Sequence, residues 1–324
     1  MQRAFDYFVY LALRAAWAVA RLVPLHALRA TLGAVSTLVY HADVHHRRVA
    51  LENLERAFPA WNEQEREHVA REAFRNWGRI SAELVHAHEM ARGRTLETIR
   101  ELERKAAELG AGGRGVLALT AHTANFELLA RLLGRVSGRR VVVFHRRMAN
   151  PFVGELLLRD RAQTNVTTLG RGMVVREALR VLERGEILVV PLDQNQSRKR
   201  GVFVDFFGHP ACTSTMLARL SLATGLQVQP AFAVWEGDDL VATLGVAIAP
   251  PVVRSRADRA DAVRDLTARY TREVEDVVRR HPSQWNWAHR RWKTRPAAPL
   301  AAASPGEEPA EEARARTASS ADRA

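Results

Sequence analysis

The sequence predicts an α/β fold with a largely parallel central sheet flanked by helices, preceded by an N-terminal helical segment at a membrane interface. The central half of the chain alternates apolar runs of strand character with segments of helical periodicity, and this alternation is typical of a parallel sheet. The start of the chain is apolar but interrupted by arginines, which indicates an interfacial helix. With 324 residues, the chain is long enough to bury a substantial core.

The N-terminal segment is too often interrupted by charge for a simple spanning helix. Residues 5–40 are rich in Leu, Ala, Val and aromatics, yet Arg14 and Arg21 lie among them, so no run reaches the roughly 20 uncharged residues that spanning needs. Both arginines fall on one helical stripe, which suits a helix lying in the bilayer interface. We therefore predict a membrane-interface segment over residues 1–42; a helix packed on a soluble domain is the alternative. Asp6 argues against a cleaved signal peptide.

The periodicity assigns the remaining elements in order. Before the sheet, helices are expected at residues 47–58, 63–90 and 95–109. Strands are expected at residues 116–120, 140–145, 164–169, 187–191, 228–234 and 241–248. Further helices are expected at residues 126–136, 151–163, 174–184, 215–224 and 257–280. The main domain is assigned to residues 43–296, and residues 297–324 contain almost no large apolar side chain, which predicts a disordered tail.

The charge balance predicts an anionic partner. The chain has 48 Lys and Arg against 36 Asp and Glu, a formal net charge of +12. Phospholipid headgroups, an acidic protein or nucleic acid would all be attracted. Cys212 is the one cysteine, which excludes a disulfide framework and a cysteine-rich zinc site. The pair His41 and His45 has the spacing of metal ligands but lacks a third, so no metal is expected.

The strongest candidate for catalysis is His122, which directly follows the strand at 116–120. In open α/β sheets, ligands bind at the carboxyl ends of the strands. Glu127 lies five residues further on, and the two side chains can converge if His122 is in the loop and Glu127 in the first turns of the helix. A carboxylate on one ring nitrogen would fix the tautomer and leave the other nitrogen to accept a proton. We expect His122 to be a general base that activates a hydroxyl, oriented by Glu127.

Several further stretches resemble one known family. They are the His-x4-Glu stretch at 122–127, the segment Phe144-His145-Arg146-Arg147-Met148-Ala149-Asn150-Pro151, the Asp-Gln pair at 193–194, the Phe-Phe-Gly block at 206–208 and the Trp-rich ending at 284–293. In this order they are similar to motifs of the bacterial late acyltransferases of lipid A biosynthesis, the lauroyl and myristoyl transferases. The resemblance extends from about residue 47 to residue 295. Two positions depart from the family pattern: His145 stands for the usual Tyr and Ala124 for a common Gly.

The resemblance implies an acyltransferase-type α/β fold and a reaction. An acyl chain would move from acyl carrier protein to a hydroxyl of a phosphorylated, acylated disaccharide at the cytoplasmic face of the inner membrane. No cofactor or metal is implied, and the expected partners are the carrier protein, the phosphorylated glycolipid and the anionic membrane surface. The residue roles implied are His122 as base with Glu127 as its partner, Arg146 on substrate phosphate or the thioester carbonyl, Asn125 and Gln194 in substrate binding, and Asp193 in support of the site and in substrate binding.

Two alternatives stay open from the sequence. The first is the same chemistry on a lysophospholipid or phosphatidylinositol mannoside acceptor, because motifs do not describe the acceptor pocket. The second is a non-enzymatic basic protein that coats membranes or nucleic acid, since the aromatic and basic residues at 285–293 suit base stacking. No nucleic-acid module surrounds that segment, so we do not expect nucleic acid as a partner. Phe203, Phe206 and Phe207 are expected as core residues of a strand pair.

Overall fold

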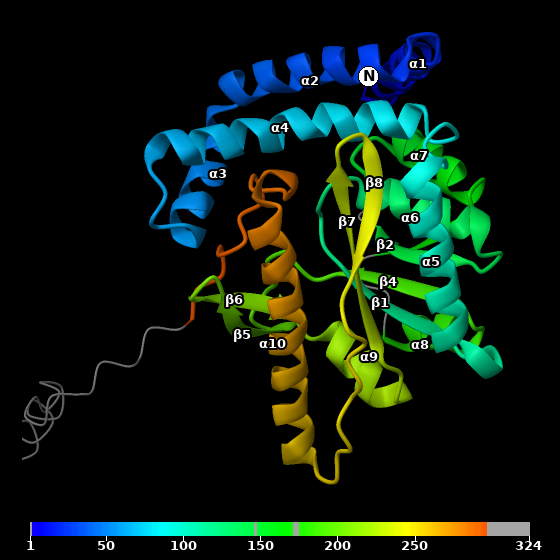
Figure 1. Cartoon of the computed structure of the whole chain (residues 1–324), viewed down its shortest axis with the longest axis vertical. Helices are drawn as coiled ribbons and strands as arrows, with labels where there is room; N and C mark the ends of the chain where they lie inside the picture. Colours follow the sequence, from blue (N-terminus) through cyan, green and yellow to red (C-terminus); the bar gives the residue numbers. More distant parts are fainter. Residues whose placement is uncertain (1, 146–147, 171–174, 297–324) are drawn as a thin grey trace, which may run out of the picture. The chain divides into compact units, whose positions relative to one another are not determined.

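A computed structural model describes residues 2–145, 148–170 and 175–296, and the described residues up to Thr294 form one compact unit. The predicted tail at 297–324 lies outside the described residues. The central sheet has the strand order β3-β2-β4-β1-β7-β8 (Figure 1). The strands are β1 (Val116–Thr120), β2 (Val141–His145), β3 (Val166–Gly170), β4 (Ile187–Pro191), β7 (Val228–Glu236) and β8 (Asp239–Leu244). All neighbours pair in parallel except β8, which is antiparallel to β7. The predicted α/β class with a mainly parallel sheet is confirmed.

The two faces of the sheet bury different sets of helices. Successive strand residues point to opposite faces, so Val116 and Ile187 pack with α5 (Gly93–Leu109) and α6 (Phe126–Val136). Leu117 and Leu188 join a second core with the helices of the other face. That face carries α8 (Val175–Glu183), α9 (Met216–Thr224) and α10 (Arg256–Arg280). Burial on both faces explains why these strands read as continuous apolar runs in the sequence.

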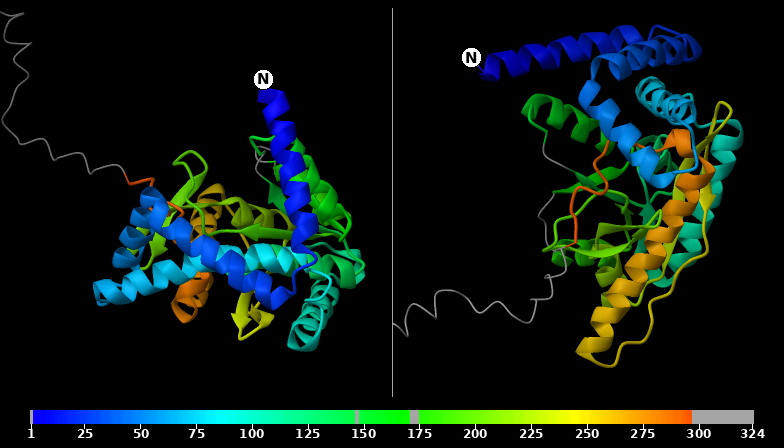
Figure 2. Two further views of the ribbon diagram at one scale, coloured as in Figure 1. Left: turned by 90° about the horizontal axis from the view of Figure 1, so that it is seen from above. Right: turned by 90° about the vertical axis from the view of Figure 1, so that its left-hand side faces the viewer.

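The N-terminal segment is two helices and not one. α1 (Gln2–Ala20) ends before Pro24, and α2 (Leu25–Ala42) begins after it, because proline favours a helix start. α2 lies along α4 (Glu63–Val85), while α1 extends away with its free end (Figures 1 and 2). A Cβ on Gly78 of α4 would be 2.2 Å from the Leu32 carbonyl oxygen, so glycine permits this close helix contact. Among the described residues no helix is long and apolar enough to cross a membrane.

The remaining helices complete the frame. α3 (Val44–Ala57) connects α2 to α4, and α4 begins at a capping box made by Asn62 and Glu65, which satisfies two backbone donors at once. α4 ends at Val85, five residues earlier than the sequence predicted. α7 (Pro151–Ala162) packs against α1, where the Phe152 ring lies edge-on to Tyr7 at 5.3 Å.

Aromatic side chains from a hairpin and from the C-terminal segment belong to the core that also contains Leu117 and Leu188. The hairpin β5 (Gly201–Phe206) and β6 (His209–Ser214) is a two-stranded sheet of its own. This confirms the expected strand pair with Phe206 and Phe207 in the core, whereas Phe203 is only partly buried. The Phe206 ring packs against Trp285 and Trp292. These two tryptophans and Trp287 are each 2% exposed or less. The alternative that the aromatic ending stacks on bases is therefore wrong, because its rings are part of the core.

Candidate active site

The turn that carries His122 is held from the C-terminal segment. β1 ends at Thr120, and residues 121–125 lead into α6. Thr123 forms an isolated antiparallel bridge with Trp285. The Ala124 amide donates to the Gln284 carbonyl at 2.8 Å, and Ala124 has a φ of +39°. A left-handed conformation is strained for alanine, and here the flanking hydrogen bond and bridge hold it.

The His122 ring is bound by Asp193. β1 and β4 are parallel neighbours with Thr120 beside Pro191, so the residues that follow both strands emerge at one edge of the sheet. His122 Nδ1 lies 2.8 Å from Asp193 Oδ1, and the His122 backbone amide donates to Asp193 Oδ2 at 3.0 Å. Trp285 Nε1 donates to the same Oδ2 at 2.8 Å. The His122 side chain is 22% exposed against 3% for Asp193, so the base faces outward over a buried carboxylate.

The environment keeps Asp193 ionised. Burial by itself would raise the pKa of this carboxyl, since desolvation disfavours the charged form. The charge and hydrogen bonds of His122, together with the Trp285 indole, outweigh burial and hold the pKa of Asp193 well below its usual range. An ionised acceptor on Nδ1 fixes the tautomer that carries a proton there. The Nε2 lone pair is then the proton acceptor of the ring.

Gln194 and Phe126 flank the other side of the ring. Gln194 Nε2 lies 3.2 Å from His122 Nε2, and with Nδ1 protonated this amide is the donor. The Phe126 ring packs edge-on to the imidazole at 4.7 Å. Gln194, predicted from the sequence as a substrate-binding residue, therefore lies beside the nitrogen that would accept a proton. A substrate hydroxyl that reaches Nε2 would replace this amide.

Glu127 does not take the position that the sequence predicted. Its Oε1 accepts from Arg161 Nε at 2.7 Å and Arg131 Nε at 3.0 Å, and its Oε2 accepts from a terminal nitrogen of Arg161 at 2.8 Å. Arg131 also pairs with Asp160. Burial would raise the pKa of Glu127, but the two arginines outweigh it and lower the pKa. The orienting carboxylate on Nδ1 is Asp193, because Glu127 in the first turn of α6 is held by the arginines on α6 and α7.

The other predicted site residues have different positions. Asn125 is fully buried and caps α6, with its Oδ1 accepting from the Leu128 amide at 3.1 Å. Its Nδ2 donates to Glu83 at 3.0 Å, so the predicted contact of Asn125 with substrate is not supported and its role is in the fold. Arg146 lies outside the described residues. Asp193 lies beneath the ring, in support of the site as predicted, and its two oxygens are bound by the groups named above.

Sequence reasoning missed Arg161 and the role of Trp285. Trp285 lies in one of the quoted motifs, but only the folded chain brings its indole to Asp193 across 92 positions. Arg161 lies on α7, 34 positions from Glu127, and no local pattern marks it. The part of the chain that the structure describes contains no cluster of three or more His, Cys, Asp or Glu side chains able to hold a metal ion. The site places an imidazole on a buried carboxylate, an arrangement that suits proton transfer from a hydroxyl.

The chain is similar in sequence to several known proteins. A family model described as bacterial lipid A biosynthesis acyltransferase matches residues 2–294. The lipid A biosynthesis palmitoleoyltransferase of Escherichia coli K12 is 28% identical over 258 residues, which cover 76% of this chain and 79% of the relative. The lauroyltransferase of the same organism is 28% identical over 262 residues, or 77% and 79%. A lipid A biosynthesis acyltransferase of Haemophilus influenzae is 28% identical over 268 residues, or 80% and 82%.

Proposed function

The chain belongs to the bacterial lipid A biosynthesis acyltransferase family, and from this premise we propose that it transfers a fatty acyl chain from acyl carrier protein to a hydroxyl of a lipid A precursor. Its family confirms the resemblance seen in the motifs and supports an acyltransferase acting on lipid A. The observation that carries the chemical proposal is the His122–Asp193 pair at the carboxyl edge of β1 and β4.

The reaction needs one base and no protein nucleophile. The acceptor hydroxyl oxygen attacks the thioester carbonyl carbon, and its proton passes to His122 Nε2. The tetrahedral intermediate collapses with cleavage of the C–S bond, and the leaving thiolate takes the proton back from the imidazolium. The ester and the free thiol are the products, and the histidine is restored. Asp193 remains ionised throughout and stabilises the imidazolium, as buried carboxylates do in other histidine-based sites.

Glu127 has a supporting role in this proposal. Its carboxylate neutralises Arg131 and Arg161 at the junction of α6 with α7. This ion-pair network fixes the first turn of α6, where Phe126 packs against the imidazole. Arg146, which precedes α7 in the sequence, is proposed to bind a substrate phosphate or to polarise the thioester carbonyl, because a guanidinium can bind two oxygens at once.

An apolar pocket beside the base suits the acyl chain. It lies between α5, α6 and the sheet face that carries Ala118 and Thr120, and Leu129 and Phe126 line it as well. Phe126 belongs both to this pocket and to the contact with His122. Its free volume is about 60 Å³, which accommodates only a short part of an alkyl chain. We assign the pocket to that part of the donor chain, which gains about 0.8 kcal/mol for each CH₂ that leaves water.

The features of the N-terminal helix α1 support the proposal that the enzyme acts at a membrane surface. α1 has no buried residue, and Phe5 and Phe8 of α1 are more than 60% exposed. Arg14 lies on the same helix and Arg21 directly follows it. An apolar face with nearby arginines suits a helix in the interface of an anionic bilayer. The net charge of +12 would also attract the acidic carrier protein and the phosphates of the acceptor. We place the enzyme at the cytoplasmic face of the inner membrane.

The test is a transfer assay with labelled acyl-acyl carrier protein and a tetra-acylated lipid A precursor. His122→Ala should lower kcat by roughly 10³-fold or more, since general base catalysis contributes on the order of 10² to 10⁴, and should keep the wild-type melting temperature. His46→Ala, which alters an exposed histidine of α3, is the matched control and should transfer normally. Near-normal transfer by His122→Ala would refute the base assignment. Thioester hydrolysis without transfer in the wild type would indicate another lipid acceptor.

A further inference from the structure

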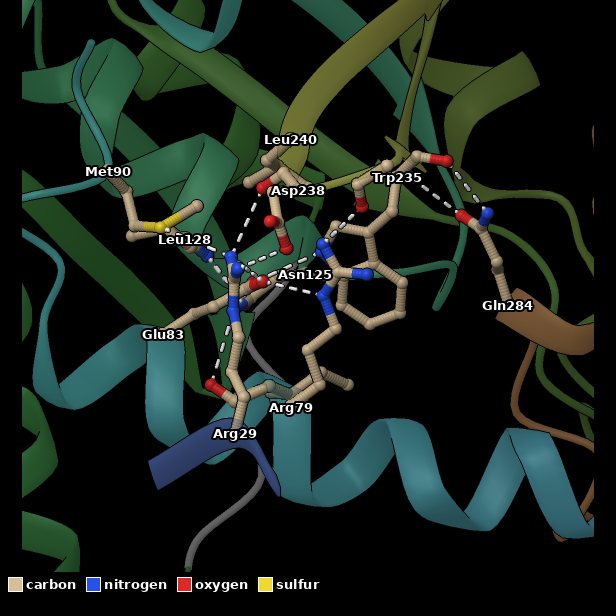
Figure 3. Close-up of polar contacts among 12 residues, drawn as sticks. Arg29, Arg79, Glu83, Met90, Asn125, Leu128, Trp235, Asp238, Leu240 and Gln284 are labelled. Atoms are coloured by element: carbon tan, nitrogen blue, oxygen red, sulfur yellow. Dashed lines mark hydrogen bonds and ion pairs between the residues drawn. The ribbon is translucent and has the colours of Figure 1, made fainter. Parts of the chain in front are cut away.

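A second buried carboxylate lies on the opposite side of the His122 turn. Glu83 of α4 is fully buried and accepts four hydrogen bonds (Figure 3). Its Oε1 accepts from Arg29 of α2 and Arg79 of α4, each at 2.8 Å. Its Oε2 accepts from Asn125 Nδ2 at 3.0 Å and Trp235 Nε1 at 3.1 Å. The two oxygens thus have separate tasks: Oε1 pairs with the charges, and Oε2 receives two neutral donors.

The cluster joins elements that are far apart in the sequence. Arg29 also donates to Asp238 Oδ1 at 2.7 Å, at the tip of the β7–β8 hairpin. Arg79 lies over the Trp235 ring, 4.4 Å from its centroid. A buried carboxylate is costly unless it is paired and fully hydrogen-bonded. Glu83 meets both conditions, so its carboxylate has a fixed position and fixes the two groups that donate to Oε2.

Asn125 connects Glu83 to the turn that carries His122. Its amide is bound at both ends: Nδ2 donates to Glu83 Oε2, and Oδ1 accepts from the Leu128 amide as the cap of α6. Asn125 lies three residues after His122. The Ala124 amide is bound by the Gln284 carbonyl and the His122 amide by Asp193. The turn is therefore fastened at several points, by the C-terminal segment, by Asp193 and by Glu83.

We propose that Glu83 is a positioning residue for catalysis, which acts through Asn125 to keep the His122 ring on Asp193. The proposal rests on the function of His122 proposed above. Misplacement of a reacting group by about 1 Å can cost on the order of 100-fold in rate, so loosening one side of this turn is expected to reduce turnover. None of the four donors to Glu83 belongs to His122 or Asp193. Glu83 therefore influences the His122 ring only through Asn125 and the backbone that joins Asn125 to His122.

The decisive variants exchange donor and acceptor across one hydrogen bond. In Glu83→Gln, the remaining side-chain oxygen faces the two arginines, so the new amide group faces the amide of Asn125, donor against donor. In Asn125→Asp, the new carboxylate faces the carboxylate of Glu83, acceptor against acceptor. The double variant places an amide donor at position 83 opposite a carboxylate oxygen at position 125 and restores this hydrogen bond, although the longer bond from Asn125 Nδ2 to the Ile80 carbonyl at 3.3 Å is lost. Asp caps a helix as well as Asn does. Rescue in the double variant is specific to this contact.

Trp235→Phe is the matched control. It removes the other donor to the same Oε2 atom and leaves the Asn125 contact in place. A purely structural role of Glu83 predicts that Trp235→Phe and Glu83→Gln behave alike. A positioning role predicts that both lower the melting temperature and that Glu83→Gln alone lowers turnover.

Two readouts separate position from stability. The first is the division between kcat and KM in the transfer assay. The second needs no substrate: the downfield proton resonance of His122 Nδ1, bound to Asp193, assigned by its loss in His122→Ala. We expect Glu83→Gln to lower kcat about tenfold or more, with KM within about twofold, and to shift or broaden the resonance. Asn125→Asp should do the same, and the double variant should regain kcat to within about threefold of the wild type.

The opposite results would overturn the proposal. They are an unchanged kcat and resonance in Glu83→Gln, equal effects in Glu83→Gln and Trp235→Phe, or a double variant no better than either single one. If Glu83→Gln does not fold, the comparison of Asn125→Asp with the double variant decides by itself. Failure of the proposed function is recognised separately, as normal transfer by His122→Ala, while the resonance still reports whether Glu83 fixes the ring.

Discussion

The turn at residues 121–125 lies between two buried carboxylates that differ in what binds them. Asp193 is 3% exposed and Glu83 is 0% exposed, and each accepts one indole hydrogen bond, from Trp285 and Trp235 respectively. Asp193 is paired with an imidazole that is partly open to solvent, whereas Glu83 is paired with two arginines. Only the imidazole can lose its proton near neutral pH. A buried carboxylate under a histidine can thus take part directly in proton transfer, whereas one between arginines can act only through the position of the groups that it holds.

Glu127 is the third carboxylate near the turn and resembles Glu83 more than Asp193. It too is bound by two arginines, Arg131 and Arg161, although its side chain is 15% exposed. The comparison therefore ranks the three carboxylates by their distance from the proposed chemistry. Asp193 contacts the imidazole directly, whereas Glu83 binds Asn125 at the end of the turn and Glu127 binds arginines of α6 and α7. Four sets of variants or conditions can break or sharpen this ranking.

The largest expected effect is that of Asp193→Asn. The new amide would face His122 Nδ1 as a donor and favour the tautomer with its proton on Nε2, which cannot act as a base. We expect kcat to fall by roughly 10³-fold or more, as for the wrong tautomer in a serine protease triad. The transfer assay measures it, with Asn195→Asp as a control on the same loop. A loss of less than about tenfold would remove Asp193 from the mechanism.

Glu127→Gln should lower kcat less than Asp193→Asn does. It should lower the free energy of unfolding more than the substitution of an exposed residue would. It removes the carboxylate that Arg131 and Arg161 share, while Arg131 keeps its ion pair with Asp160, so we expect the free energy of unfolding to fall by about 2 kcal/mol and kcat by about tenfold. Urea denaturation and the transfer assay measure the two effects. If Glu127→Gln loses more turnover than Asp193→Asn, the assignment from sequence spacing is right and the ranking of the three carboxylates is wrong.

The two indoles provide a matched pair of smaller effects. Trp285→Phe and Trp235→Phe each remove one donor to a carboxylate, so each should lower the free energy of unfolding by about 1.5 to 3 kcal/mol. Trp285→Phe should in addition lower kcat a few-fold, because its partner is Asp193. Thermal unfolding and kinetics on both variants test this. Equal kcat values for the two would erase the distinction between the carboxylates.

The smallest effect is a pH dependence at the acid limit. The pKa values of Asp193 and Glu127 are both lowered in the folded chain. Each therefore contributes stability above its unfolded pKa, about 3.9 and 4.3, and that stability is lost as the pH falls through the folded value. The stability gap between the wild type and Glu127→Gln should be constant from about pH 8 to 5 and narrow below about pH 4. A gap that closes between about pH 7 and 6 in urea titrations would point to histidine instead.

The sequence predicted the frame of the fold because buried parallel strands are legible as apolar runs. The strands at 116–120 and 187–191 have the bounds that the pattern predicts. Pro24 marks the break between α1 and α2, a signal that the periodicity of the whole segment obscured. The tryptophans of the ending suit base stacking in the sequence because arginines lie among them, yet Arg291 itself is buried and donates to Thr213. Local composition does not show on which side of a core such a segment lies.

By itself, the sequence determined the α/β class, the edge of the sheet where His122 emerges and the family to which its motifs belong. Only the tertiary structure decided which carboxylate meets the imidazole. Asp193 lies 71 positions from His122 and reaches it because β4 pairs in parallel beside β1. Glu127 is near in sequence but is turned toward α7 and its arginine. Spacing along a chain constrains neighbours within one element, whereas the order of strands in a sheet is set by packing between elements.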